Sequence, residues 1–374
     1  MKYKSYILLF IISILAISLS ACVGVQTDWP GLSADEQSAY VAFNNHVYAV
    51  NLDDGTQKWR YPVDQDNTKT FFASPALSPD GQLIVGGYDS VLYSLNPETG
   101  GPTNWNFPDA ENRYIASALA IEEGIFVAAA DQNLYALDQG GQLRWTFPTE
   151  RESWSQPITN AECDCIYLST MDHKVYAIDP QDGSQIWQSP ELDGAIAGNP
   201  AYSEEGVLYV GTFGGKLFAL NAEDGSVLWE FSTTPHPQTF LLVLETSNNG
   251  WVWSGPVLSD GILYFGDLNG YFYAIDAKNG QQIWQLTPDD LDGEIVGSPL
   301  VIEDDIYIVS QGGTLFNYDT SRKLKWERNI GAEIFTTPVS ANDLILVAPK
   351  QEDKFLVAFN KDGVEQWSFP PAGE

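Results

Sequence analysis

One short motif recurs eight times along this 374-residue chain, and it constrains the fold more than any other feature. In most copies a Tyr or Phe is followed by a small residue, an aliphatic residue and Asp or Asn, and a tryptophan follows ten to twelve residues after the first position. The copies begin at Tyr48, Tyr93, Tyr135, Tyr176, Phe218, Tyr273, Phe316 and Val357, and their tryptophans are Trp59, Trp105, Trp145, Trp187, Trp229, Trp284, Trp326 and Trp367. Such regularity indicates one structural unit repeated in series.

The spacing of these tryptophans selects the kind of unit. Successive tryptophans lie 40 to 46 residues apart, except for one interval of 55 residues between Trp229 and Trp284. This period suits four short strands per unit. The intervening segments alternate apolar with polar residues and are broken by Gly, Asn and Asp, which is typical of hairpins and disfavours a helical solenoid. The sequence therefore predicts an all-β, eight-bladed β-propeller with four-stranded antiparallel blades.

The unit over residues 200–229 shows the expected strands most clearly. It predicts strands at 200–202, 207–210, 217–220 and 226–229, with glycine turns between them. Pro30 lies 18 residues before Tyr48, the interval that also separates Pro200 from Phe218. Blade one is therefore expected to have its own inner strand, so that the ring closes by packing of whole blades.

The repeated tryptophans are expected to be structural. A large indole in each blade can pack as an apolar plate against the next blade, and the glycine permits a tight turn. In this respect the sequence resembles the quinoprotein-like (PQQ-like repeat) propellers, whose tryptophan-docking motif has Ala, Asp, Gly and Trp at positions one, three, seven and eleven. Four blades fit fully, as in Ala177, Asp179, Gly183 and Trp187, whereas blade seven has Ser321-Arg322 where the glycine is expected. The resemblance covers residues 29–369.

Residues 1–21 are predicted to be a signal peptide, because a basic start at Lys2 and Lys4 precedes an apolar run over 7–19. The following Leu19-Ser20-Ala21-Cys22 resembles the bacterial lipobox, which implies a lipid-modified Cys22 (palmitate among its acyl chains) and a short tether over 22–28 leading to a single domain over 29–374. The alternative is an ordinary signal peptide with an incidental cysteine. Val23 in place of Asp favours the outer membrane in a two-membrane cell, and otherwise the outer face of the cytoplasmic membrane.

The formal net charge is −32, and removal of Lys2 and Lys4 would make it −34. Such a field repels phosphate backbones and argues against a nucleic-acid partner. A solvated acidic surface or adaptation to salty surroundings accounts for the charge more simply than recognition through acidic groups does, and bound calcium is a lesser alternative.

No catalytic residue or cofactor is predicted. Quinone-dependent dehydrogenases of the resembled superfamily hold pyrroloquinoline quinone (PQQ) and calcium beside an adjacent cysteine pair, and this chain has no Cys-Cys step. Cys163 and Cys165 could pair, bind metal or fill space, and the three histidines are scattered. Two acidic segments, 289–294 and 191–194, are calcium candidates, but their shared Leu-Asp-Gly pattern favours repeated turns.

The long interval between Trp229 and Trp284 indicates an insertion of about a dozen residues before blade six. Two apolar stretches in it, 239–244 and 251–253, flank a predicted polar turn over 247–250. The insertion either projects as a hairpin that binds a partner or folds down over the channel. Its candidate partner-binding residues are Phe240, Leu241, Leu242, Trp251 and Trp253.

The chain most resembles the lipid-anchored propellers of the outer-membrane β-barrel assembly machinery, the BamB type. That resemblance implies a monomeric, non-catalytic, extracytoplasmic scaffold that binds protein partners at the membrane. Two alternatives remain: a cell-surface adhesion, sensing or wall-associated module, and a quinone-dependent oxidoreductase.

Overall fold

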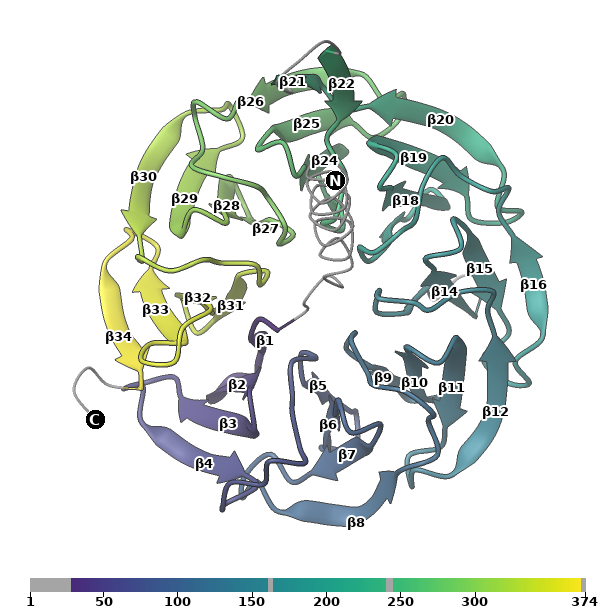
Figure 1. Ribbon diagram of the computed structural model, residues 1–374, viewed down its shortest axis with the longest axis vertical. Coiled ribbons are helices and arrows are strands. Elements are labelled where there is room, and N and C mark those ends of the chain that lie inside the picture. Colours follow the sequence, from purple (N-terminus) through teal and green to yellow (C-terminus); the bar gives the residue numbers. More distant parts are fainter. Residues whose placement is uncertain (1–27, 161–163, 240–244, 371–374) are drawn as a thin grey trace, which may run out of the picture.

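The computed structural model describes residues 28–160, 164–239 and 245–370. They form eight four-stranded antiparallel sheets arranged in a ring around a common axis, together with one two-stranded sheet (Figure 1). The predicted eight-bladed propeller is therefore confirmed. Within these described ranges, no helix is long and apolar enough to cross a membrane.

Each blade consists of four strands that run from the channel outwards in chain order (Figure 1). Blades one to four comprise β1 (Gly31–Ala34), β2 (Ser38–Phe43), β3 (His46–Asn51), β4 (Gln57–Tyr61); β5 (Ala76–Leu77), β6 (Leu83–Gly86), β7 (Leu92–Leu95), β8 (Pro102–Phe107); β9 (Leu119–Ile121), β10 (Gly124–Ala129), β11 (Asn133–Leu137), β12 (Leu143–Pro148); and β13 (Ile158–Asn160), β14 (Cys165–Ser169), β15 (Val175–Ile178), β16 (Gln185–Gln188). Blades five to eight comprise β17 (Ala201–Ser203), β18 (Val207–Gly211), β19 (Lys216–Asn221), β20 (Val227–Ser232); β23 (Val257–Ser259), β24 (Ile262–Gly266), β25 (Phe272–Asp276), β26 (Gln282–Leu286); β27 (Leu300–Ile302), β28 (Asp305–Val309), β29 (Thr314–Asp319), β30 (Leu324–Asn329); and β31 (Val339–Ala341), β32 (Leu344–Val347), β33 (Leu356–Asn360), β34 (Glu365–Phe369).

The two middle strands of each blade form the core, which lies between neighbouring blades. In blade three, every residue of β10 is buried, whereas β12 at the outer rim is mostly exposed. A middle strand is covered on both faces by adjacent blades and therefore reads as a continuous apolar run. An outer strand is covered on one face only and alternates.

The repeated tryptophans join each blade to the next. Trp187 illustrates the contact: its indole Nε1 donates a hydrogen bond of 3.0 Å to the carbonyl oxygen of Ala222 in blade five. A Cβ atom added to Gly225 of that blade would lie only 2.6 Å from the Trp187 ring, so the motif glycine gives the indole room. Equivalent indole-to-carbonyl hydrogen bonds are made by Trp59, Trp145, Trp229, Trp284, Trp326 and Trp367.

Trp105 departs from this pattern. Its indole Nε1 donates 2.8 Å to the side-chain Oε1 of Gln82 in its own blade instead of to a carbonyl of blade three. The ring still packs against the next blade, because a Cβ atom on Gly141 would lie 2.2 Å from it. Gln82 in turn donates from Nε2 to the carbonyl oxygen of Gln139 in blade three at 3.0 Å, so Trp105 is joined to the next blade by packing and through this side chain.

Closure of the ring joins blade eight to blade one. Trp367 Nε1 donates to the carbonyl of Leu52, and the Thr336 hydroxyl donates to the carbonyl of Pro30. Because β1 to β4 form one sheet and β31 to β34 another, the prediction of closure by packing of whole blades is correct.

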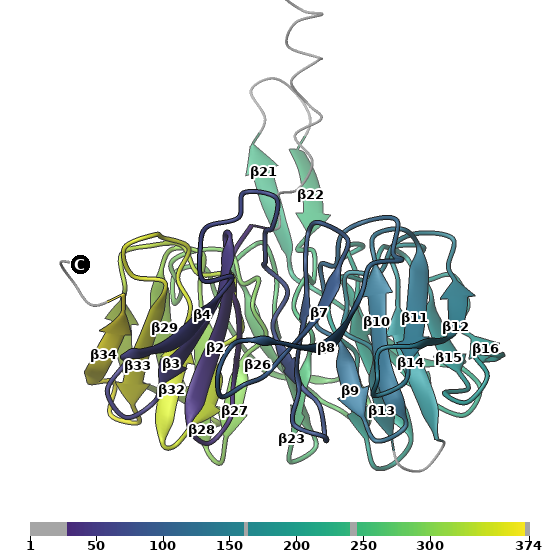
Figure 2. The same cartoon turned by 90° about the horizontal axis from the view of Figure 1, so that it is seen from below.

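The insertion between blades five and six forms an antiparallel hairpin of β21 (Pro235–Thr239) and β22 (Glu245–Asn249) that stands out from one face of the disc (Figure 2). The predicted turn over 247–250 is wrong, because Ser247 pairs with Pro237 inside the hairpin. The physical reason is a clamp at its base: the Thr233 hydroxyl lies 3.0 Å from the carbonyl oxygens of both Gly215 and Gly250. Both ends of the insertion are thereby held together, and this sets the strand register.

Candidate functional site

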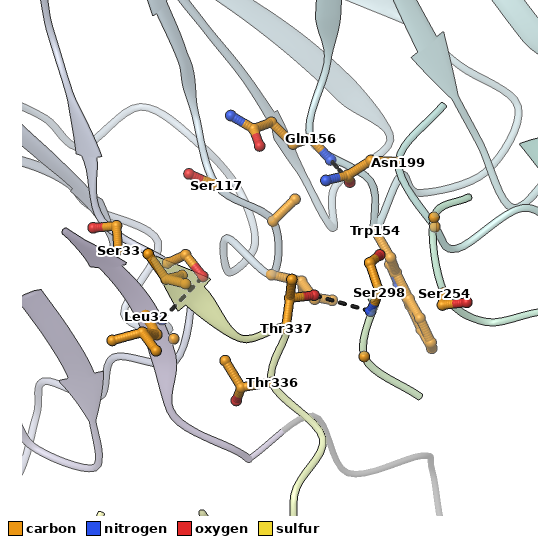
Figure 3. A pocket seen from close by; sticks show the side chains of 18 of the residues that line it. Leu32, Ser33, Ser117, Trp154, Gln156, Asn199, Ser254, Ser298, Thr336 and Thr337 are labelled. Carbon is orange, nitrogen blue, oxygen red and sulfur yellow. Dashed lines mark hydrogen bonds between the residues drawn. The ribbon is translucent and has the colours of Figure 1, made fainter. Parts of the chain in front are cut away.

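A cavity of about 660 Å³ lies on the axis of the propeller and is lined by segments from all eight blades. Figure 3 shows part of this lining. The lining comes chiefly from the segments that lead into the inner strands, because these strands stand closest to the axis. Corresponding positions of the repeat therefore meet around the cavity and form rings.

One such position contributes an apolar side chain from every blade, and we call this set the apolar ring. In each blade this residue lies two to four residues before the inner strand. The members are Trp29, Phe72, Ile115, Trp154, Ala197, Trp253, Val296 and Phe335. Four of the five aromatic members form a continuous series of ring contacts. The centroid of Trp253 lies 5.6 Å from that of Trp154 and 6.1 Å from that of Trp29. Trp29 in turn stacks on Phe335 at 5.3 Å.

This aromatic series extends outward to the hairpin-bearing face. Phe213, in the loop between β18 and β19, lies 5.1 Å from Trp253 and stacks on Trp251 at 5.1 Å with an interplanar angle of 11°. Trp251 is 49% exposed. Thus the four tryptophans outside the docking motif, Trp29, Trp154, Trp251 and Trp253, belong to one aromatic series.

Sequence reasoning identified Trp251 and Trp253 but missed the other members. The available signal was positional: in seven blades the member of the apolar ring stands four residues before the inner strand, whereas Trp29 stands only two residues before β1. The predicted candidates Phe240, Leu241 and Leu242, and the lipidation candidate Cys22, lie outside the described residues.

Two residues further along each segment, the cavity has a second set of side chains, which we call the polar ring. It consists of neutral hydroxyl and amide groups: Ser74, Ser117, Gln156, Asn199, Ser298 and Thr337. Gly31 and Gly255 occupy this position in blades one and six. Three of its members accept backbone hydrogen bonds across blade boundaries (Figure 3): Gln156 N to Asn199 Oδ1 at 2.7 Å, Ser298 N to Thr337 Oγ1 at 3.0 Å, and Leu32 N to Ser74 Oγ at 3.2 Å.

The lining of the cavity carries no charged side chain among the described residues. PQQ bears carboxylate groups that require cationic or strongly donating partners, and calcium requires several oxygen ligands that usually include carboxylates. Neither requirement is met by the two rings, so the residues present do not fit a PQQ–calcium centre. Within the described part of the chain, no group of three or more His, Cys, Asp or Glu side chains could hold a metal.

The two acidic calcium candidates each accept hydrogen bonds from a neighbouring loop. Asp292 accepts hydrogen bonds from the hydroxyls of Ser310 and Thr314, and Asp193 accepts one from Thr212 at 2.7 Å. These are contacts of turn residues that hold neighbouring loops. Cys165 is 2% exposed and disulfide-bonded, while Cys163 lies outside the described residues.

The base of the hairpin is also held by a buried tyrosine. The hydroxyl of Tyr273 accepts a hydrogen bond of 2.9 Å from Thr234 N and donates one of 2.9 Å to Asp267. Burial, followed by the nearby Asp267 carboxylate, raises the pKa of Tyr273 above its usual range. The phenol therefore stays protonated and keeps donating, which fixes the start of β21 over blade six.

Eight four-stranded blades joined by docked tryptophans define a propeller of PQQ-like repeats. The family model described as outer membrane protein assembly factor BamB matches residues 43–194, 171–287, 243–331 and 269–374. These segments cover most of the chain, and the chain therefore belongs to this family.

Individual relatives agree with this assignment at lower coverage. Outer membrane protein assembly factor BamB of Yersinia pestis is 29% identical over 217 residues, which are 54% of this chain and 50% of that protein. Tetrathionate hydrolase of Acidithiobacillus ferrooxidans is 32% identical over 90 residues, 24% of this chain and 17% of that enzyme. The chain spans half or less of the length of the curated relatives it matches. BamB from Moraxella catarrhalis shares the fold, with a TM-score of 0.67 at 16% identity over 85% of this chain and 90% of that structure.

Proposed function

We propose that this protein is a lipid-anchored, extracytoplasmic scaffold that binds a protein partner in the assembly of outer-membrane proteins and catalyses no reaction. Membership of the BamB family supports this role. The partner is proposed to be an outer-membrane barrel protein with periplasmic repeat domains, bound by a monomeric propeller.

The observation that carries the proposal is the Trp251–Phe213 stack at the base of the projecting hairpin. Trp251 is about half exposed, yet its ring is held nearly parallel to Phe213. A rigid, partly exposed tryptophan loses little conformational entropy on binding, and such residues dominate the energetics of many protein interfaces. The hairpin beside it supplies a feature that projects towards the partner.

The chain path supports a partner at the membrane surface. Asp28 lies six residues after the proposed lipid site, Cys22, so an extended tether reaches only about 20 Å at roughly 3.5 Å per residue. Trp29 belongs to the same aromatic series as Trp251. We therefore propose that the hairpin-bearing face is the one turned towards the membrane.

The non-catalytic part of the proposal rests on the chemistry of the cavity. Among the residues that the structure describes, its uncharged lining offers no acid, base or nucleophile pair of the kind that hydrolysis or proton transfer would use. The short match to tetrathionate hydrolase does not bring such groups into the cavity of this chain.

The test is affinity purification of the crosslinked, lipidated protein from its own membranes, followed by mass spectrometry. Three variants are compared with the wild type: Trp251→Ala, replacement of residues 237–247 by Asn-Gly, and Ile186→Ala. The Asn-Gly replacement joins His236 to Asn248, which are paired opposite each other, by a two-residue turn and leaves Val252 and Trp253 in place. Ile186 is 51% exposed on an outer strand and controls for loss of an exposed apolar side chain.

Recovery of an outer-membrane barrel protein with periplasmic repeats, lost in the first two variants and kept in the third, is the expected result. Recovery of only wall or surface proteins would replace the assembly role by a surface-binding role. The anchor is tested separately, because Cys22→Ser should move the protein from the membrane to the soluble fraction.

A further inference from the structure

The cavity on the axis is neutral although the chain as a whole is strongly acidic. With a formal net charge of −32, a random selection of lining residues would include several carboxylates. None of the described lining residues is charged. A neutral cavity offers no ion pair to an ionic ligand, which would have to give up its hydration without compensation. Its chemistry therefore selects an uncharged molecule.

The two rings also place apolar plates and hydrogen-bonding groups at different depths. In the apolar ring, Trp29, Trp253 and Phe335 are only partly buried, so parts of their surfaces face the cavity. Two residues further along, the polar ring presents hydroxyl and amide groups from six blades. A ligand that fits both rings needs a weakly polar C–H face and several closely spaced hydroxyl groups.

Two polar atoms of the lining are buried without a hydrogen-bond partner. They are Ser33 Oγ and Trp154 Nε1, contributed by blades one and four, and both side chains line the cavity (Figure 3). Buried polar groups are satisfied in most proteins, and leaving one unpaired costs about 1–3 kcal/mol. Both atoms are closed to solvent, however, so a ligand in the cavity reaches neither of them, and its hydrogen bonds must come from the polar ring.

We propose that this cavity binds a neutral oligosaccharide. The C–H groups on the face of a sugar ring carry a partial positive charge and pack against the negative face of an indole or phenyl ring. Sugar hydroxyls both donate and accept, as do the Ser, Thr, Asn and Gln side chains of the polar ring. The cavity volume of about 660 Å³ lies within the range of small-molecule sites, about 300–1,000 Å³.

A neutral peptide fits this arrangement less well. Its backbone presents donors and acceptors in a fixed alternation along a line, which suits an open strand edge. Here the polar groups come from six different blades and are distributed around the axis, with Gly31 and Gly255 at the other two positions. Such a ring suits a compact ligand with hydroxyl groups around its perimeter.

The test is titration of the full protein with a panel of neutral di- to tetrasaccharides, namely glucans, mannans, galactans and N-acetylglucosamine oligomers. Binding is followed by tryptophan fluorescence and calorimetry. A galacturonic acid trisaccharide serves as a charged counterpart, and an Ala-Gly-Ser peptide with acetylated N-terminus and amidated C-terminus, which is uncharged, tests the alternative ligand class. We expect at least one neutral saccharide to bind, and neither the acidic trisaccharide nor the peptide to do so.

The diagnostic variant is Asn199→Asp. An Asp at this position can still accept the hydrogen bond from Gln156 N, so the contact between blades is kept while the cavity gains a charge and loses an amide donor. The matched control is Asn279→Asp, whose side chain accepts from Gln281 N in an exposed turn away from the cavity. We expect saccharide affinity to fall at least tenfold in Asn199→Asp and to stay unchanged in Asn279→Asp.

A third variant, Trp253→Ala, removes one aromatic plate and should also abolish binding. If it does not fold, the Asn199→Asp comparison still decides the question. The proposal is overturned if no neutral saccharide binds at concentrations up to about 10 mM. It is equally overturned if Asn199→Asp binds as the wild type does, or if only the peptide binds.

Discussion

The indole Nε1 of Trp367 donates a hydrogen bond of 2.8 Å to the carbonyl oxygen of Leu52, 315 residues earlier in the chain. This contact repeats, at the closing seam, the docking that joins most pairs of neighbouring blades. The Trp367 ring also covers Gly55, where an added Cβ atom would lie 2.8 Å from the indole. The two ends of the propeller are thus held by the same device as its interior.

We therefore expect Trp367→Phe to destabilise the whole fold. The substitution removes one hydrogen bond, worth about 1 kcal/mol, and part of a large apolar contact, for a total loss of roughly 2 kcal/mol in the free energy of unfolding. Urea denaturation followed by circular dichroism measures this loss. Trp251→Phe, at a half-exposed position, should change the free energy by less than about 0.5 kcal/mol. Equal effects of the two substitutions would contradict the role given to the closing seam.

Blade seven offers a substitution that should increase stability. Arg322 adopts a φ of +74° in the turn where the repeat motif has glycine, and this left-handed conformation is strained for a residue with a Cβ atom. Arg322→Gly should stabilise the protein by about 1 kcal/mol. The lost ion pair to Asp290, 3.4 Å apart and exposed, contributes little.

The control for this prediction is Arg322→Ala. It removes the same ion pair but keeps a Cβ atom at φ +74°, so no gain is expected. A thermal shift assay on both variants distinguishes relief of backbone strain from loss of charge. A gain of the same size in both variants would show that the conformation is not the cause.

The repeat made the fold predictable because the residues that determine each blade lie within that blade or the next one. The tryptophan, the turn glycine and the alternating strands all act within about 42 residues, or on the immediately following blade. Blade seven was still predicted correctly although Arg322 replaces the motif glycine, because the free-energy cost of one strained turn is small beside the stabilisation from packing a whole blade.

The cavity was not predictable in the same way. Trp29 and Phe335 stack although they are separated by 306 residues, and the apolar ring varies between Trp, Phe, Ile, Val and Ala. No local motif marks such a position. The hairpin register was predicted wrongly for a related reason, since the Thr233 clamp depends on Gly215, which lies in a loop of blade five that precedes the insertion.

The loop between blades one and two should contribute a pH-dependent part of the stability. Hydrogen bonds from the Thr68 hydroxyl and then from Lys69 lower the pKa of Asp66 from 3.8 to about 2. Because the pKa is lower in the folded state, this stabilisation is present above about pH 4 and is lost as the pH falls towards 2. Asp66→Asn should therefore lower the melting temperature at pH 6, and the difference from wild type should narrow below pH 4.

A second variant checks the cause of this pH dependence. Thr68→Val removes the hydroxyl donor, which lies 2.6 Å from Asp66 Oδ1. Like Asp66→Asn, it should make the melting temperature depend less on pH than it does in the wild type. Differential scanning calorimetry between pH 6 and pH 2.5 provides the measurement. If the melting temperatures of Asp66→Asn and the wild type differ by the same amount over this whole range, titration of Asp66 is not the cause of the difference.

The clamp at the base of the hairpin gives the last prediction. The Thr233 hydroxyl, 2% exposed, lies 3.0 Å from the carbonyl oxygens of Gly215 and Gly250, and these contacts hold together the two ends of the insertion. Thr233→Val keeps the size of the side chain and the bond of 2.9 Å from Thr233 N to the Gly215 carbonyl. The buried Gly250 carbonyl loses the hydroxyl donor, at a cost of about 1–3 kcal/mol. This loss destabilises the attachment of the hairpin and not the ring, because the blades on either side keep their docked tryptophans. We expect hydrogen exchange to accelerate over 233–253 and limited proteolysis to cut there first, while the melting temperature of the propeller changes little.

Thr234→Val, which keeps the backbone N–H bonded to Tyr273 and loses only the contact with Gln285, should show a much smaller effect. Uniformly faster exchange over all eight blades in Thr233→Val would mean that the clamp supports the ring itself and not the hairpin.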